Sequence, residues 1–174
     1  MQPLSKVPGT LRELVEADVR RAARLIIKIQ DEIDWQFRFA TRQGDFHVAV
    51  TMAGSDTDRR MVLDHLRVFM VWKQALAFIL ATETLDDHLY ALGVAAHEAH
   101  HCRVPIQREP RPWSSANFGE VEWLPPEAVD PELRSLLPSG LRALTPKEVS
   151  AMTAWFGRDG RFPAINMKTG EIGA

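Results

Sequence analysis

Hydrophobic and polar residues follow two different periods in the first third of the chain. Over residues 10–33, apolar residues recur every three or four positions, which predicts an amphipathic helix. Thr10 and Glu13 form a capping-box pattern at its start. From Trp35 the period is two, and apolar residues alternate with other residues on both sides of Gly44. Two such runs around a short glycine-containing turn predict a β-hairpin with one aromatic face buried.

Two further helices are predicted after the hairpin. The first begins after Ser55 and continues to about Thr82. Its second half is apolar on nearly every side, which is typical of a helix at the centre of a fold. The second covers about residues 85–102, and Pro105 is expected to end it. The predicted core is therefore a helix, a hairpin and two more helices, over residues 10–104.

The C-terminal third, residues 105–174, has a different character, with most of the eleven prolines and three of the five tryptophans. We expect it to lie over the core or over a partner, with a short strand within 117–124, a short helix within 131–137 and a capped helix near 146–156. The predicted fold is one domain, 1–174, of α+β class but mainly α. Three long helices pack on the aromatic β-hairpin, with a Pro/Trp-rich C-terminal segment and one further helix.

Composition and charge narrow the possible environments. A chain of 174 residues is long enough to bury an apolar core without disulfides. The net charge of −2 gives no electrostatic reason to expect nucleic acid as a partner. The longest uncharged apolar run is too short to cross a bilayer, so no membrane partner is expected either. The single cysteine, Cys102, excludes an intramolecular disulfide and suits a cytoplasmic protein.

One run, His97-Glu98-Ala99-His100-His101, combines residues that can carry chemistry. On a helix, His97 and His101 project from one face one turn apart, which is the spacing that lets two imidazoles hold Zn²⁺. Glu98 beside them can accept a proton from a metal-bound water. The pattern therefore predicts two metal ligands and a catalytic base.

Residues 94–102, Val-Ala-Ala-His-Glu-Ala-His-His-Cys, resemble the zinc-binding helix of the zincin metallopeptidases. The resemblance implies a zinc-dependent, peptidase-like hydrolase with His97 and His101 as ligands and Glu98 as general base. A third ligand has to come from later in the chain, and Glu120 or Glu122 is within reach.

Three other interpretations remain open. Glu98 and His101 also match the Glu-x-x-His spacing of di-iron helical bundles. The histidines can equally have a structural role, as side chains bonded to a neighbour or as cations at a helix C-terminus. Finally, the chain can be a non-catalytic adaptor or assembly subunit that binds a protein partner or itself. That alternative uses the Pro/Trp-rich third and predicts an exposed apolar patch between Trp113 and Trp123.

Overall fold

The computed structural model describes residues 9–50, 56–109, 116–139, 142–156 and 164–166. The described helices are α1 (Leu11–Ile29), α2 (Asp56–Lys73), α3 (Pro131–Arg134) and α4 (Pro146–Phe156), with one 3-10 turn, η1 (Pro126–Ala128). The described strands are β1 (Trp35–Thr41), β2 (Gly44–Val50), β3 (Ala75–Thr84), β4 (His88–Ala95), β5 (Ala99–Arg108), β6 (Ala116–Phe118), β7 (Glu122–Leu124) and β8 (Ala164–Asn166).

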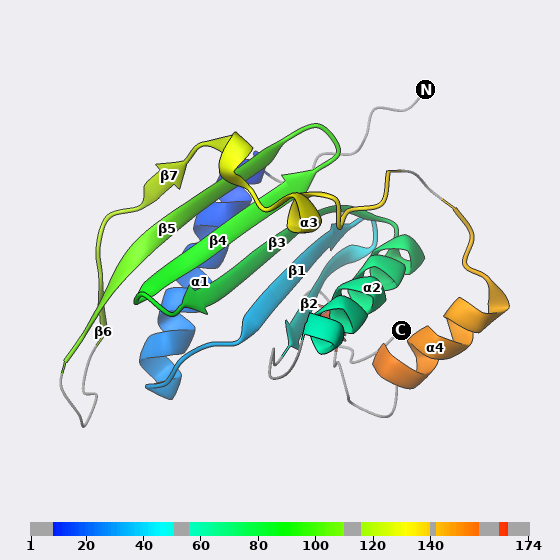
Figure 1. Ribbon diagram of the computed structural model, residues 1–174, viewed down its shortest axis with the longest axis horizontal. Helices are drawn as coiled ribbons and strands as arrows, with labels where there is room; N and C mark the ends of the chain where they lie inside the picture. Colours follow the sequence, from blue (N-terminus) through cyan, green and yellow to red (C-terminus); the bar gives the residue numbers. More distant parts are fainter. Residues whose placement is uncertain (1–8, 51–55, 110–115, 140–141, 157–163, 167–174) are drawn as a thin grey trace.

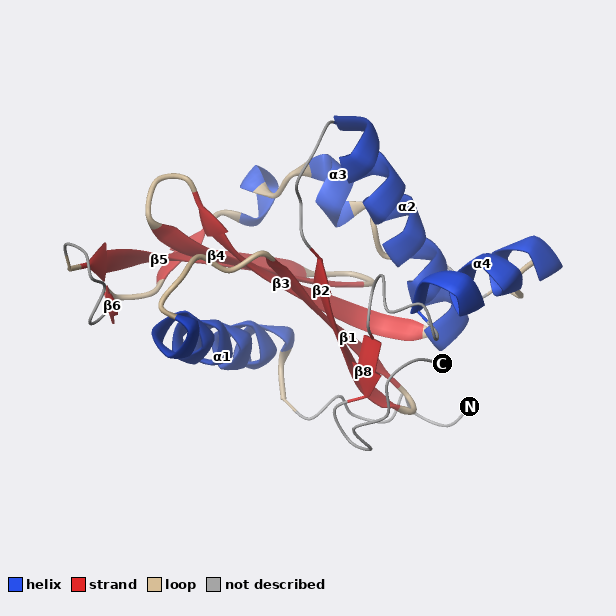
Figure 2. Cartoon of the chain, turned by 90° about the horizontal axis from the view of Figure 1, so that it is seen from below, coloured by secondary structure: helices blue, strands red, loops and turns tan. Residues whose placement is uncertain are grey.

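The described strands form one antiparallel sheet in the order β6-β5-β4-β3-β1-β2-β8, with β7 paired to β5. Figure 1 shows the sheet face-on, with α2 and α3 in front of it and α1 behind. The edge-on view in Figure 2 shows α1 alone on one face and α2, α3 and α4 on the other. The main contacts of α1 are with β3, β4 and β5, so this helix is not centred over β1 and β2.

Each face of the sheet has its own apolar layer. On the α2 face, Phe37 and Phe39 of β1 lie against Phe78 of β3 and Phe69 of α2, with ring centroids 5.2 to 6.2 Å apart. The expected hairpin and its buried aromatic face are therefore confirmed. On the α1 face, the layer consists of aliphatic side chains from the helix and the strands, among them Val15, Ile26, Ile79 and Leu89.

The position of α1 follows from its sequence. Its predicted cap is confirmed: Thr10 Oγ1 accepts a hydrogen bond from the Glu13 amide, and the Glu13 carboxylate accepts one from the Thr10 amide. The helix approaches β4 closely at Gly93, where the Cβ of any other residue would lie 2.6 Å from Val15 Cγ2. Glycine at this position allows α1 to pack tightly on the centre of the sheet.

The prediction of one helix from residue 55 to about Thr82 is wrong in its second half. The helix α2 ends at Lys73, Gln74 adopts a left-handed conformation with φ 52°, and the chain returns as β3. The run of apolar residues in β3 is buried on both faces, because β1 and β4 flank it and helices cover the two sides of the sheet. A continuous apolar run fits a central strand as well as a buried helix, and periodicity does not separate the two.

The prediction of a helix over residues 85–102 is wrong throughout. That segment forms β4, a connection and the first part of β5, which pair as an antiparallel hairpin. Both faces of β4 are largely buried, so its sequence shows no alternation between apolar and polar residues. Pro105 does not end an element either, because it lies within β5.

The C-terminal third contributes to the sheet as well as covering it. The expected strand within 117–124 is two short strands, β6 and β7, that pair with β5. The expected short helix within 131–137 is α3, and the helix near 146–156 is α4. The predicted fold class is nevertheless wrong, because a large antiparallel sheet replaces the mainly helical core. The protein is α+β and is not mainly α.

Candidate functional site

The predicted zinc ligands lie on the β4–β5 hairpin and not on a helix. His97 and Glu98 are exposed in the connection between the strands, where the Glu98 carbonyl accepts a hydrogen bond from the Ala95 amide. His101 lies on β5 and is 2% exposed. The helical spacing that would place His97 and His101 one turn apart on a common face is therefore absent.

Both ring nitrogens of His101 have hydrogen-bond partners inside the protein. Nε2 lies 2.7 Å from the Pro125 carbonyl oxygen, which can only accept, so Nε2 carries the proton. Nδ1 lies 3.0 Å from the Tyr90 hydroxyl oxygen and accepts a hydrogen bond from that hydroxyl. Burial raises the pKa of Tyr90 to about 12, which keeps that hydroxyl protonated. His101 therefore connects β4 to the segment after β7, and neither nitrogen has a lone pair free for a metal.

The other predicted site residues are not gathered around His101. Glu98 lies 3.1 Å from His100 Nε2, and Glu122 forms an ion pair with Arg103 at 2.7 Å. Glu120 is exposed on the connection between β6 and β7. Across the described ranges, no group of three or more His, Cys, Asp or Glu side chains is arranged to hold a metal ion. The helical geometry on which the zinc and di-iron interpretations depended is wrong.

Cys102 and Trp123 are both packed against neighbouring parts of the protein, and neither takes part in a reactive group of side chains. Cys102 is fully buried, and burial raises the pKa of its thiol to about 12. Trp123 is half-buried beside α1, with the Arg12 guanidinium 4.2 Å from its ring centroid. Trp113 lies outside the described residues, so the apolar patch expected between these two tryptophans stays a prediction.

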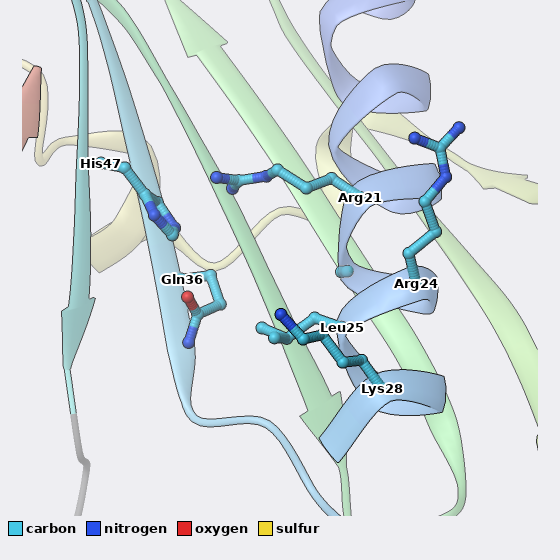
Figure 3. A pocket seen from close by; sticks show the side chains of 7 residues that line it. Arg21, Arg24, Leu25, Lys28, Gln36 and His47 are labelled. Atoms are coloured by element: carbon cyan, nitrogen blue, oxygen red, sulfur yellow. The ribbon is translucent and has the colours of Figure 1, made fainter. Parts of the chain in front are cut away.

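A pocket of about 360 Å³ lies between α1 and the β1–β2 hairpin. Its helical wall comes from the second half of α1: Arg21, Ala22, Arg24, Leu25 and Lys28. Its floor comes from Gln36 of β1 and His47 of β2 (Figure 3). The pocket exists because α1 packs over β3, β4 and β5, which leaves the same face of β1 and β2 only partly covered.

The local sequence explains why this uncovered face is polar. The apolar residues of the hairpin point towards α2, so the alternating positions between them point towards the α1 side. Gln36 and Arg38 occupy these positions on β1, and Asp45 and His47 occupy them on β2. The aromatic surface and the pocket floor are thus the two opposite faces of the β1–β2 hairpin, and the alternation of residues along the strands produces both.

Basic side chains dominate the electrostatics of the pocket. Residues 20–29 of α1 include four cations and no acid. The nearest buried carboxylate, Asp18, lies 3.1 Å from Arg21 and 3.6 Å from Arg38. Burial raises the pKa of Asp18, and the two arginines act against that rise. Arg38 has a second carboxylate partner in Asp45, so it is held in place from both sides.

His47 is a polar side chain in this pocket whose hydrogen-bonding capacity is not fully used. Its Nε2 atom is buried and has no hydrogen-bond partner. Burial, with the positive charges of Arg21 and Arg38, lowers the pKa of His47 to about 4. The ring is therefore neutral at pH 7. Gln36 is 8% exposed, and its amide nitrogen donates to the Asp34 carbonyl oxygen at 3.3 Å.

Sequence reasoning missed this pocket, although two signals for it are present in the chain. The non-aromatic face of the hairpin contains a glutamine, an arginine, an aspartate and a histidine, which is unusually polar for a face turned towards a helix. The second half of α1 is basic without acidic neighbours at helical spacing. What the sequence does not contain is the sideways placement of α1 on the sheet, which brings these two surfaces together.

Comparison with protein-family models, with curated proteins and with solved structures finds no match. No helix among the described residues combines the length and apolar character needed to cross a membrane. The function therefore has to be inferred from the pocket and the side chains that line it.

Proposed function

We propose that the protein is a binding protein for a small organic anion, held in the pocket between α1 and the β1–β2 hairpin. The observation that carries this proposal is the buried, unpartnered Nε2 atom of His47 in a pocket that Arg21 also lines. Buried polar atoms normally have a partner, and those that lack one in the protein alone are candidates for contact with a ligand.

The size and charge of the pocket support this class of ligand. A volume of about 360 Å³ is within the range of small-molecule sites. The cationic groups of α1 attract negative charge, while Ala22 and Leu25 give the middle of the wall an aliphatic surface. The preferred ligand is therefore an anion with an apolar part, and not a bare inorganic ion.

The same side chains favour binding over catalysis. The residues that line the described pocket include no carboxylate, thiol or hydroxyl group that could act as a nucleophile. A histidine with a pKa of about 4 is also a weak base at pH 7. Zinc-dependent hydrolysis at His97, Glu98 and His101 remains a separate hypothesis, with less support because both ring nitrogens of His101 have partners.

We also propose a cytoplasmic location, on the basis of the single buried cysteine.

Association with a protein partner or with a second copy, through the Pro/Trp-rich third, remains compatible with ligand binding. It would make the chain a ligand-responsive adaptor. Ligand binding in the pocket requires neither the cytoplasmic location nor the association. Association can be tested by measuring the molecular mass of the protein in solution with and without ligand.

The experiment is a titration of the full chain, followed by ¹H–¹⁵N spectra, with octanoate, octyl phosphate and octylamine as probes. The two anions are expected to shift the amide signals of residues 21–28 and of Gln36, and the ring signals of His47. Octylamine, which has the same tail but a positive head, is expected to cause no saturable shift.

One variant and a matched control test the location. His47→Leu should weaken binding of both anions, since it removes a polar group that lines the pocket. Arg20→Gln removes an exposed positive charge that is next in sequence to Arg21 but is not part of the pocket, and it should bind normally. The proposal is wrong if no anion binds, or if anions bind equally well to His47→Leu and to the unchanged protein.

A further inference from the structure

The exposed surface of the pocket is almost entirely apolar, and a cation of α1 lies towards each of its two ends. Figure 3 shows the guanidinium of Arg21 pointing from α1 towards His47, and the ammonium of Lys28 pointing towards the strand that carries Gln36. These two cations are seven residues apart on the helix, which corresponds to about 10 Å along its axis. Ala22 and Leu25 form the wall between them.

The strands also place two polar side chains apart on the floor of the pocket, at a shorter separation than the two cations of α1. Arg38 is opposite His47 in the β1–β2 register, and Gln36 is opposite Ala49. Gln36 and His47 are therefore two positions apart along the hairpin, or about 7 Å. Each end of the pocket thus combines one cation from α1 with one neutral hydrogen-bonding side chain from a strand.

The two ends differ in how their cation is held. Arg21 is fixed by its contact with the buried Asp18, at 3.1 Å. Lys28, in contrast, forms no ion pair with any carboxylate among the described residues. A ligand with a single acid group would satisfy one end and leave its apolar tail against the polar groups of the other.

We propose that the ligand is an aliphatic dianion, with an acid group at each end of a hydrocarbon chain. This inference rests on the proposed binding function and specifies its ligand class. One acid group contacts Arg21 and receives a hydrogen bond from His47 Nε2, in the tautomer that protonates that atom. The other contacts Lys28 and the amide of Gln36, and the hydrocarbon chain lies against Ala22 and Leu25.

The experiment is calorimetric titration of the full chain with octanedioate and with its monomethyl ester. The two compounds have the same chain length, but the ester lacks the second charge. We expect octanedioate to bind at least about ten-fold more tightly, which corresponds to one charge-assisted contact. Butanedioate, which is too short to reach both ends, should bind more weakly than octanedioate.

Two variants assign the second acid group to its contact. Lys28→Gln should bring the affinity for octanedioate down to that for the ester, while Arg20→Gln should preserve the difference. If the ester binds as tightly as octanedioate, the dianion inference is wrong and the proposed binding of a small anion stands. If octanedioate, its ester, octanoate and octyl phosphate all fail to bind, both proposals are wrong.

Discussion

The β4–β5 hairpin and the pocket beside α1 both contain histidines near charged groups, but they differ in whether those histidines have partners. On the hairpin, His101 uses both ring nitrogens within the protein, and His100 contacts Glu98. In the pocket, His47 Nε2 is buried without a partner. The hairpin, which has more reactive residues in its sequence, thus uses the ring nitrogens of His101 in structural contacts, whereas the pocket contains a buried polar atom without a partner.

The two regions also differ in how closely the chain is packed around them. On β4, α1 approaches so closely that a Cβ at position 93 would lie 2.6 Å from Val15 Cγ2. Over β2, the same helix leaves a pocket of about 360 Å³. The placement of one helix therefore produces both a very close contact and an open site. The candidate site in this protein therefore coincides with incomplete packing and a buried atom that has no hydrogen-bond partner.

The largest effect should come from His101. In His101→Leu, the Tyr90 hydroxyl and the Pro125 carbonyl lose their partner in a buried position, so we expect the free energy of unfolding to fall by about 3 kcal/mol. Urea unfolding measures this change. His47→Leu is the matched variant in the pocket, and it should cost less than about 1 kcal/mol because Nε2 has no bond to lose. Equal losses in the two variants would contradict the comparison.

A smaller effect is expected where α1 contacts β4. Gly93→Ala should lower the free energy of unfolding by about 2 kcal/mol, since the added Cβ would lie 2.6 Å from Val15 Cγ2. Combining it with Val15→Ala makes room for the new methyl group. The double variant should therefore lose less than the sum of the two single losses. Simple additivity would show that α1 is not held closely at this position.

The pH dependence of stability tests the state of His47. Because its pKa is lowered to about 4 in the folded protein and is near 6.5 in the unfolded chain, the unfolded state binds more protons between these values. The free energy of unfolding should therefore fall as the pH drops from 6.5 towards 4, by at most about 1 kcal/mol per pH unit. Urea unfolding at several pH values should show a shallower fall in His47→Leu. Identical slopes would mean that His47 is not held neutral by its surroundings.

The smallest effect is expected at His97, which is exposed on the β4–β5 connection. His97→Ala should change the free energy of unfolding by less than about 0.5 kcal/mol. The same variant tests the zinc hypothesis when the metal content of untagged protein is measured beside it. Zinc near one per chain in the unchanged protein, lost in His97→Ala, would place function on the hairpin after all.

The parts of the fold that could be predicted are those in which sequence pattern and environment agree. Helix α1 has one apolar side and a capping box, and β1 and β2 alternate because only one of their faces is in an apolar layer. The alternation is lost in β3 and β4, where both faces are covered, and a buried strand then resembles a buried helix. Those two strands are where the prediction of further long helices is wrong.

The candidate site was less predictable than the fold for a related reason. The proposed metal-binding geometry of the run from His97 to His101 assumed a helix, so the error in secondary structure removed the geometric basis of that prediction. The pocket, in turn, depends on which strands α1 covers, and neither the helix nor the hairpin specifies this in its own pattern. Gln36 and His47 become neighbours through strand register, which is a tertiary property.

Because Cys102 is buried, the rate at which its thiol reacts can be used to measure opening of the structure around it. Its thiol lies in the apolar layer beneath α1, and its pKa of about 12 makes it unreactive while that layer is intact. A thiol reagent can modify it only when the layer opens, so the labelling rate measures how often the helix separates from the sheet. Since α1 is also one wall of the pocket, the same rate, followed with and without octanedioate, reports how strongly an occupied pocket restrains that opening.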